Sequence, residues 1–335
     1  MLNSSKDAPA ESAPLLSVVI CVRNGASFLP GLCDALLGLE EPRGGFEVIF
    51  VDDQSTDGTN AYLERIAERD RRFSIVCGRG LGQAAARNDG IARARGQFVA
   101  MTDADVIPDR DWLLQTANVL ENGHVRAVEG LVDPWSDDGP LAPLVRNVRN
   151  QDGGRFMTAN MVYERSLLEE LGGFDEAFRP PSFLEDTDIA FRTLDLGVDI
   201  PFATSVRVRH RDVLLTPGAA LRSLGGLKWM ALVARKHPVR YEALLRTKVQ
   251  TLRPGDVDLL LGLLLLLTTR GARARERLLV LAQCAVALRR VLRVAEVGRV
   301  PQSERIPWLV VALVSPALRT FHLVEGWVRF RTVAL

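Results

Sequence analysis

The sequence predicts an α/β protein: a mostly parallel sheet flanked by helices, followed by a helical, basic and apolar C-terminal extension. Two observations predict the sheet. Apolar, β-branched runs alternate with helix-like segments up to about residue 212, and the links between them are short, as in right-handed crossovers. The third observation is composition, since a 335-residue chain that is 47% hydrophobic and 25% charged can bury a large core. A disordered or disulfide-stapled protein is thereby excluded.

Each apolar run in the first half is short and continuous, as a strand buried on both faces requires. The stretches between these runs show helical spacing, for example at Leu29, Leu32 and Leu36. The elements expected in chain order are a strand at 16–22, a helix at 26–39, a strand at 46–53, a helix at 58–69, a strand at 73–78, a helix at 81–94, a strand at 97–105, a helix at 185–197 and a strand at 205–210.

The chain divides into a polar leader at 1–14, expected to be disordered, a sheet-bearing domain at 15–212 and a helical region at 213–335. Its net charge of +1 hides an asymmetry. Residues 1–204 carry 19 basic and 33 acidic side chains, whereas residues 205–335 carry 23 and 8. The front part therefore suits a cation-dependent site and the back part an anionic partner. Four scattered cysteines and a leader without the apolar core of a secretion signal favour a cytoplasmic location.

Polar residues gather where the predicted strands end, which is where ligands bind in sheets of this kind. Acidic groups at neighbouring strand ends repel each other unless a cation lies between them, so a divalent ion with a nucleotide diphosphate is the natural ligand. Of four D-x-D patterns, only Asp103/Asp105 directly follows a buried apolar strand. The strand ends are Arg23-Asn24, Asp52-Asp53, Gly78-Arg79-Gly80 and Asp103-Ala104-Asp105.

Four sequence blocks in one order give the chain a family resemblance. They are VDDQSTDGT (51–59), GQAAARNDGIARARGQFVAMTDAD (82–105), LEELGGFDEAF (168–178) and FLEDTDIAFR (183–192). Together they resemble a family 2 glycosyltransferase with a GT-A fold, over roughly residues 15–212. The resemblance implies an inverting hexosyltransferase that uses a nucleotide-sugar, usually a UDP-sugar.

The resemblance also implies which residues bind the donor. Asp53, or its neighbour Asp52, would accept a hydrogen bond from the base, because a carboxylate suits the imide N–H of uracil. One of these acids capping the next turn is the alternative. Arg87 and Asn88 match the family segment that lies along the nucleotide, although Arg87 as a solvated helix residue is the alternative. The full donor set expected is Arg23, Asn24, Asp52, Asp53, Arg79, Arg87, Asn88 and Asp103, with Asp103 on the ribose.

By the same resemblance, Asp105 would bind Mg²⁺ or Mn²⁺ between the two phosphates, and the metal would neutralise the leaving diphosphate. His210 would complete the metal shell or close over the diphosphate; a surface histidine among arginines is the alternative. Asp186 would be the general base that deprotonates the acceptor hydroxyl, with Glu185 as its substitute. Asp188, about 200° around the helix from Asp186, should face elsewhere.

The back third lies outside the resemblance. Its three apolar runs, at 259–269, 278–288 and 308–318, are shorter than the ~20 residues needed to span a bilayer. Arginines flank them, and Trp308 and Trp327 are residue types that favour membrane interfaces. We expect a helical element in the membrane interface, peripheral on the inner face of the membrane; a soluble subdomain or dimer seam is the alternative. No nucleic-acid-binding motif appears.

These signals predict a membrane-associated, metal-dependent inverting glycosyltransferase of cell envelope polysaccharide biosynthesis. It would move a sugar to a hydroxyl of a lipid-linked or cell-surface glycan acceptor. A nucleotidyltransferase is the rival enzyme, but it needs a Gly/Lys/Arg-rich loop after the first strand, which CVRNGAS does not offer. A degenerate transferase acting as a membrane scaffold is the non-enzymatic rival, and the intact Asp105 and Asp186 argue against it.

Overall fold

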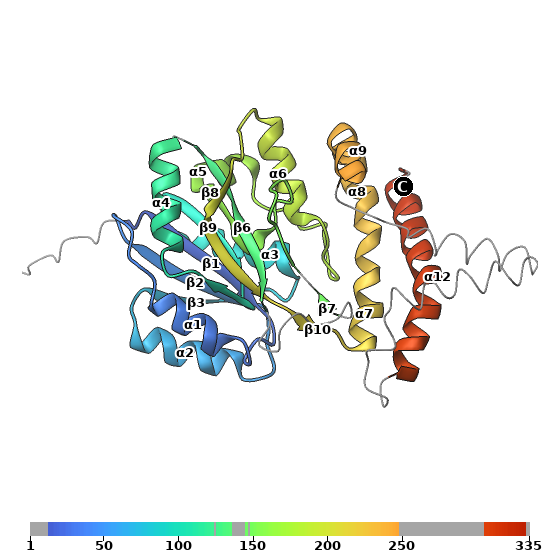
Figure 1. Ribbon diagram of the computed structural model, residues 1–335, viewed down its shortest axis with the longest axis horizontal. Coiled ribbons are helices and arrows are strands. Elements are labelled where there is room, and N and C mark those ends of the chain that lie inside the picture. Colours follow the sequence, from blue (N-terminus) through green and yellow to red (C-terminus); the bar gives the residue numbers. More distant parts are fainter. Residues whose placement is uncertain (1–12, 124, 136–144, 147, 248–304, 333–335) are drawn as a thin grey trace, which may run out of the picture.

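The computed structural model describes residues 13–123, 125–135, 145–146, 148–247 and 305–332 (Figure 1). Its centre is an eight-stranded sheet with the order β3-β2-β1-β4-β8-β6-β9-β5. The first four strands in the chain are parallel neighbours and occupy the predicted positions. They are β1 (Leu16–Val22), β2 (Phe46–Asp52), β3 (Phe73–Cys77) and β4 (Phe98–Asp103).

The sheet is mixed beyond β4. β8 runs antiparallel to both β4 and β6, β6 and β9 are parallel, and β5 is antiparallel to β9. The predicted α/β class is confirmed, and its parallel part is the half that contains the short strand–helix repeats. The later strands are β5 (Val106–Pro108), β6 (Ala127–Trp135), β8 (Met161–Glu164) and β9 (Phe202–Arg211).

Helices cover both faces of the sheet. Alternate residues of β1 point to opposite faces, so Val18 and Ile20 belong to one core and Val19 to the other. The first core packs against α1 (Leu29–Leu37), α2 (Thr59–Arg69) and α4 (Trp112–Gly123). The second packs against α3 (Gln83–Arg93), α5 (Arg165–Leu171) and α6 (Glu185–Asp195).

The C-terminal helices form a separate layer beside α6 (Figure 1). A third apolar cluster joins them to the sheet-bearing part, with Phe178 and Phe191 on one side and Trp229, Met230 and Leu323 on the other. The long helix packs against the three elements that follow the sheet. These three are α7 (Pro217–Ser223), the 3-10 helix η2 (Leu224–Lys228) and α8 (Trp229–Lys236); the long helix is α12 (Arg305–Phe330), and α9 (Pro238–Thr247) follows α8.

The remaining elements are short: β7 (Val145–Arg146) pairs with β10 (Val213–Leu214), and η1 (Thr158–Asn160) precedes β8. The apolar runs at 259–269 and 278–288, and the leader up to residue 12, lie outside the described residues. The third run, at 308–318, lies in α12, a helix of 26 residues. Within the described ranges, none of the helices combines the length and the apolar character needed to cross a membrane.

Candidate active site

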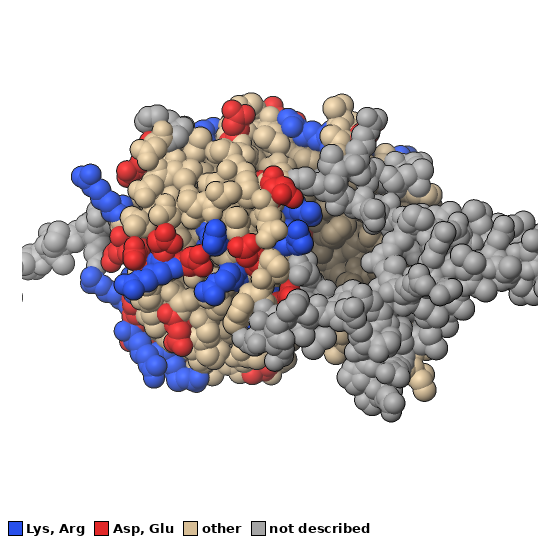
Figure 2. Space-filling view, in the orientation of Figure 1, with Lys and Arg blue, Asp and Glu red and all other residues tan. Residues whose placement is uncertain are grey.

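A cavity of about 720 Å³ lies at the carboxyl ends of β1, β2 and β4. In the space-filling view the surface is hollowed beside the sheet-bearing part, on the side toward which the C-terminal helices lie in Figure 1 (Figure 2). One side of the cavity is polar and comes from the strand ends, and the other is largely apolar and comes from the segments after α5. Its lining includes Arg23, Asn24, Asp53, Asp103, Asp105 and His210 on the first side, and Pro181, Phe183, Leu215, Leu224 and Leu227 on the second.

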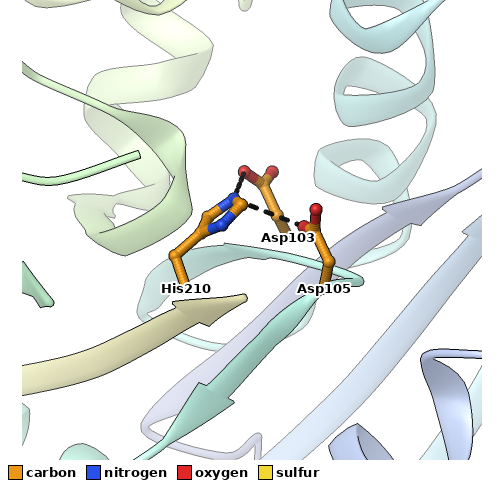
Figure 3. Close-up of side chains that lie close together, drawn as sticks. All are labelled: Asp103, Asp105 and His210. Carbon is orange, nitrogen blue, oxygen red and sulfur yellow. Dashed lines mark ion pairs between the residues drawn. The ribbon is translucent and has the colours of Figure 1, made fainter. Parts of the chain in front are cut away.

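Asp103, Asp105 and His210 form the most compact group of possible metal ligands among the described residues (Figure 3). One ligand atom from each lies within 4.8 Å of the others. His210 Nε2 is 3.4 Å from Asp105 Oδ1 and 3.8 Å from Asp103 Oδ2. The pairing of β5 with β9 places His210 opposite Val106, so two distant segments meet at this point. From the family resemblance we expect Asp103 to contact the ribose of the donor. In the structure its side chain lies with those of Asp105 and His210.

The chemistry of this group fits a divalent cation. His210 Nδ1 donates to the Arg211 carbonyl oxygen at 3.0 Å, so Nε2 is the ring nitrogen that faces the two carboxylates. Burial acts to lower the pKa of His210, but its hydrogen bond with Asp103 and the charges of Asp105 and Asp103 raise it overall. A site with this excess of negative charge, two carboxylates and one imidazole suits Mn²⁺, and Mg²⁺ less well because of the nitrogen ligand.

Next to Asp103, Arg87 joins α3 to α6. Its side chain is 5% exposed and lies 2.8 Å from Glu185 Oε1 and 3.7 Å from Asp103 Oδ1. The guanidinium also stacks over the ring of Phe174, 5.4 Å from its centroid. Burial acts to lower the pKa of Arg87, but the charges of Glu185 and Asp103 raise it, so this guanidinium stays positive. Arg87 therefore balances the negative charges of Asp103 on β4 and Glu185 on α6.

Asp186 is the first-turn acid of α6 whose ionisation is most perturbed. Burial and the charge of Glu185 raise the pKa of Asp186 to about 7, and Arg87 acts in the opposite direction. The charge of Asp103 also acts on it. Asp186 itself is not among the described residues that line the cavity. Glu185 is committed to Arg87, so Asp186 is the member of this pair with the chemistry of a base near neutral pH.

The first two strand ends are organised by their own acids. Asp53 accepts hydrogen bonds from the N–H groups of Gly80 and Gly82, at 2.7 and 3.1 Å, and borders the cavity. Asp52 accepts one from the N–H of Ser55, at 2.9 Å, which is the turn-capping role weighed in the sequence. Asn24 accepts from the N–H of Thr56, at 2.8 Å. These bonds fix the loops, and Arg23 is exposed at the cavity beside them.

Arg79 and Asn88 have other partners. Arg79 pairs with Asp89 at 2.9 Å and with Glu176 at 2.5 Å, on the side of α3 that faces the turn after α5. The Asn88 amide donates to the Phe174 carbonyl oxygen at 2.9 Å and accepts from the Phe174 N–H at 2.8 Å. Within the described part of the chain, neither residue is among those that line the cavity.

The apolar wall of the cavity was not foreseen from the sequence. Leu224 and Leu227 reach it because two glycines between them lie close to the neighbouring loop. A Cβ atom at Gly225 would come 3.1 Å from Pro181 Cγ, and one at Gly226 would come 3.0 Å from Phe183 Cβ. The Leu-Gly-Gly-Leu sequence therefore indicates that another segment packs closely against residues 225 and 226. It does not identify that segment as the loop containing Pro181 and Phe183.

Known proteins match this chain in sequence and fold. Residues 17–175 match the family model described as glycosyl transferase family 2. Glycosyltransferase AglE of Haloferax volcanii is 26% identical over 204 residues, 58% of this chain and 66% of that protein. Beta-monoglucosyldiacylglycerol synthase of Nostoc sp. is 26% identical over 200 residues, 54% of this chain and 41% of that protein. The chain thus spans about half the length of the curated relatives it matches.

Among solved structures, the mannosyltransferase PcManGT from Pyrobaculum calidifontis, in complex with GDP-Man and Mn²⁺, has the same fold. The TM-score is 0.59 at 22% identity, and the match covers 93% of this chain and 90% of that chain. The predicted GT-A architecture is thereby confirmed.

Proposed function

Because residues 17–175 match the glycosyl transferase family 2 model, we propose that the chain belongs to this family and is an inverting, metal-dependent glycosyltransferase. It moves a sugar from a nucleotide-sugar to a hydroxyl group of an acceptor. The observation that carries the proposal is the convergence of Asp103, Asp105 and His210 at one edge of the cavity. Arg87 links this group to the start of α6, because it pairs with Asp103 and with Glu185, the residue before Asp186.

Each side chain of the site has a task in this reaction. Asp103, Asp105 and His210 hold Mn²⁺ or Mg²⁺, which when bound neutralises the charge of the leaving diphosphate. Asp186 accepts the proton of the acceptor hydroxyl as its oxygen attacks the anomeric carbon from the side opposite the diphosphate. Arg87 pairs with Glu185 at 2.8 Å, so that Asp186 is the acid free to take the proton.

We assign the donor as a UDP-sugar, with a GDP-sugar as the alternative. Asp53 borders the cavity, and a carboxylate can accept from the N–H groups that both uracil and guanine present. The printed ligand of PcManGT is GDP-Man, which gives the guanine alternative its weight. Arg23, exposed at the same edge, can pair with a phosphate.

The acceptor is lipid-linked in this proposal. The wall opposite the metal ligands contains Phe183, Leu215, Leu224 and Leu227, an apolar lining that a sugar alone does not require. The name of the Nostoc relative describes a synthase of a glycolipid, which agrees with such an acceptor.

An exposed apolar stripe on α12 supports attachment to the inner face of the cell membrane. Its side chains recur every three, four or seven residues, so they share one face of the helix. Basic residues at its C-terminal end, including Arg329 and Arg331, can contact anionic lipid. The stripe consists of Ile306, Val310, Val314, Phe321, Val324 and Val328, which are between 38% and 75% exposed.

A donor screen tests the activity. The chain is incubated with Mn²⁺ and a panel of UDP-, GDP-, CMP- and dTDP-sugars, and the released nucleotide is measured. Release from one class of donor is expected, and no release from any donor would refute the proposal. Diphosphate release from a nucleoside triphosphate and a sugar phosphate would instead identify the rival nucleotidyltransferase.

Vesicle flotation tests the attachment. Phe321→Glu on α12 should reduce flotation with anionic vesicles, while Leu196→Glu, at a 49% exposed leucine after α6, should not. Equal flotation of both variants contradicts the lipid contact. A change in oligomeric state in Phe321→Glu, measured by light scattering, would indicate that the stripe is a dimer seam.

A further inference from the structure

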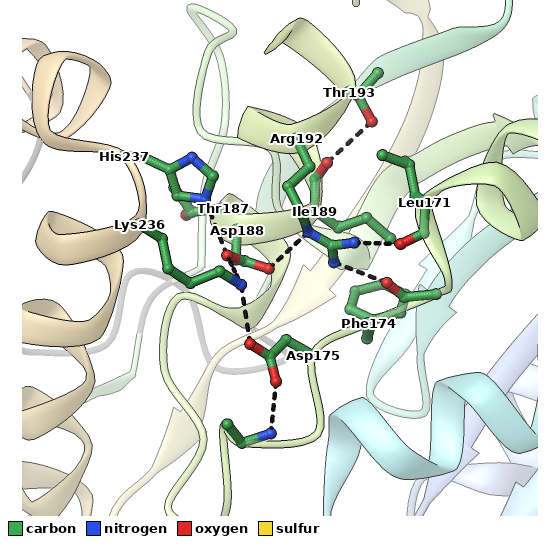
Figure 4. A network of polar contacts seen from close by, with 12 residues as sticks. Leu171, Phe174, Asp175, Thr187, Asp188, Ile189, Arg192, Thr193, Lys236 and His237 are labelled. Carbon is green, nitrogen blue, oxygen red and sulfur yellow. Dashed lines mark hydrogen bonds and ion pairs between the residues drawn. The ribbon is translucent and has the colours of Figure 1, made fainter. Parts of the chain in front are cut away.

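Asp188 lies on α6, two residues after Asp186, and its side chain is fully buried. Since two residues turn a helix by about 200°, these two acids leave α6 on opposite sides. The charges of Arg87 and Asp103 act on Asp186, whereas Asp188 faces the C-terminal helices (Figure 4). A buried carboxylate is costly unless it is paired. Its basic partners are Lys236 Nζ at 2.5 Å, His237 Nε2 at 3.0 Å and Arg192 Nε at 3.0 Å.

These partners connect α6 to two further segments. Arg192, one turn along the helix, also donates to the carbonyl oxygens of Leu171, at the end of α5, and of Gly173, in the turn after it, both at 2.7 Å. Lys236 ends α8, at its junction with α9, and also pairs with Asp175 at 2.9 Å. Since these are charge-assisted hydrogen bonds with preferred directions, α6 cannot rotate or slide without breaking several of them together.

Packing alone does not require this polar cluster. Phe191 of α6 already contacts the C-terminal helices through the apolar cluster that contains Trp229. Replacing a buried ion pair by apolar side chains of similar volume is often neutral or stabilising. Burial acts to raise the pKa of Asp188, but the hydrogen bonds from His237 and Lys236 and nearby positive charge lower it overall. The cluster therefore contributes fixed geometry and a permanent charge on α6.

The position of Asp186 follows that of the helix. Its carboxylate accepts hydrogen bonds from the N–H and the hydroxyl of Thr187, at 2.7 and 3.4 Å, and Thr187 belongs to the same helix. A displacement of α6 therefore moves the base relative to the proposed metal ligands, which lie at the end of β4, in the turn after it and on β9. A misplacement of about 1 Å can cost on the order of 10²-fold in rate.

We propose that Asp188, Lys236 and His237 form a positioning cluster through which the C-terminal helices hold α6, and with it Asp186, in place for proton removal. The inference rests on the function proposed above and assigns these residues no contact with substrate. In this proposal the junction of α8 and α9 is needed for catalysis, in addition to any role of the C-terminal helices in binding a membrane.

Lys236→Met tests the cluster, because it removes the charge and keeps the length of the side chain. Lys236→Arg is the conservative rescue. Lys228→Met is the matched control, since Lys228 is also half-buried and pairs within the C-terminal region, with Glu325 of α12 at 3.7 Å. Three quantities are measured: kcat with the best donor of the screen, Kd for UDP and for GDP with Mn²⁺ by calorimetry, and amide hydrogen exchange of α6.

Lys236→Met should lower kcat at least tenfold, speed exchange in α6 and leave both Kd values within twofold. Lys236→Arg should recover most of kcat, and Lys228→Met should match the wild type in all three. Unchanged exchange in α6, unchanged kcat, or equal losses of kcat and nucleotide affinity would overturn the proposal. If Lys236→Met does not fold, His237→Asn is measured against the same outcomes. Absence of transfer by the wild type refutes the proposed function, whereas unchanged α6 exchange refutes the cluster alone.

Discussion

The variant Asp186→Asn tests two properties of this side chain separately: its proposed role as the base and the effect of its raised pKa on stability. Burial and Glu185 raise the pKa of Asp186 from its ordinary 3.8 to about 7, so the folded protein holds a proton that the unfolded chain releases. The sign follows from linkage: this carboxyl group stabilises the fold below about pH 4 relative to higher pH, and that contribution is lost as the pH rises through 7. Three pKa units correspond to about 4 kcal/mol, which is an upper limit for the cost of ionising Asp186 above pH 7.

Asparagine has the same shape and does not ionise, so the variant should avoid that cost. We expect Asp186→Asn to be more stable than the wild type at pH 8 by about 1–3 kcal/mol, and equally stable at pH 4. Transfer should fall by about 10² to 10⁴ because no base remains. In the wild type, kcat/KM should rise by up to about tenfold from pH 6 to pH 8, and a metal ion beside Asp103 lowers the midpoint.

The assays are urea denaturation at both pH values and nucleotide release with Mn²⁺ between pH 5 and pH 9. Nucleotide binding by the variant, measured by calorimetry, is the control that its donor site is intact. Transfer retained by Asp186→Asn would refute its role as base and direct attention to Glu185. A variant that is less stable than the wild type at pH 8 would contradict the raised pKa itself.

Two further expectations concern the neighbours of this acid. Asp105→Asn should weaken Mn²⁺ binding, measured by calorimetry, at least tenfold. Asp109→Asn is the control: Asp109 belongs to the D-x-D pattern just before α4 and pairs with Arg209, and its replacement should leave the affinity unchanged. Equal Mn²⁺ affinities of the two variants would contradict the metal assignment. Arg87→Gln should lower the free energy of unfolding by about 3–5 kcal/mol, because it leaves Glu185 buried and unpaired. The double variant Arg87→Gln/Glu185→Gln should recover part of this loss, and strictly additive losses would show that the pair is not coupled.

The first half of the fold could be predicted because its information is local. Strands such as LSVVICV are buried on both faces, and their continuous apolar pattern needs no knowledge of their neighbours. The predicted helix at 81–94 is found at Gln83–Arg93, shorter by a few residues at its ends, as expected where capping decides the boundary. The antiparallel pairing around β8 has no such local signal, because it depends on where distant strands meet.

The candidate site, like the fold, could be predicted where the signal is local and not where it depends on distant contacts. Position after a buried strand selected Asp103 and Asp105, and helical periodicity correctly turned Asp188 away from Asp186. Periodicity gives the direction of a side chain but not its partner, so the contacts of Asp188 with Lys236 and His237 could not be inferred. The same holds for Arg79 and Asn88, which the structure pairs with Glu176 and with the backbone of Phe174.

Ion pairs within the chain explain part of the charge asymmetry of the sequence. An acidic front part and a basic back part were read as signs of a cation on one side and an anionic partner on the other. Some of the opposite charges pair with each other within the chain: Asp188 and Asp175 pair with Lys236, and Asp195 pairs with Arg240 at 2.6 Å at the surface. Surface pairs of this kind contribute little, but those of Asp188 are buried and therefore depend on correct docking of the C-terminal helices. In the attachment proposed above, lipid would contact α12, which packs against α8, the helix that ends at Lys236, so contact with lipid and placement of Asp186 are expected to be linked.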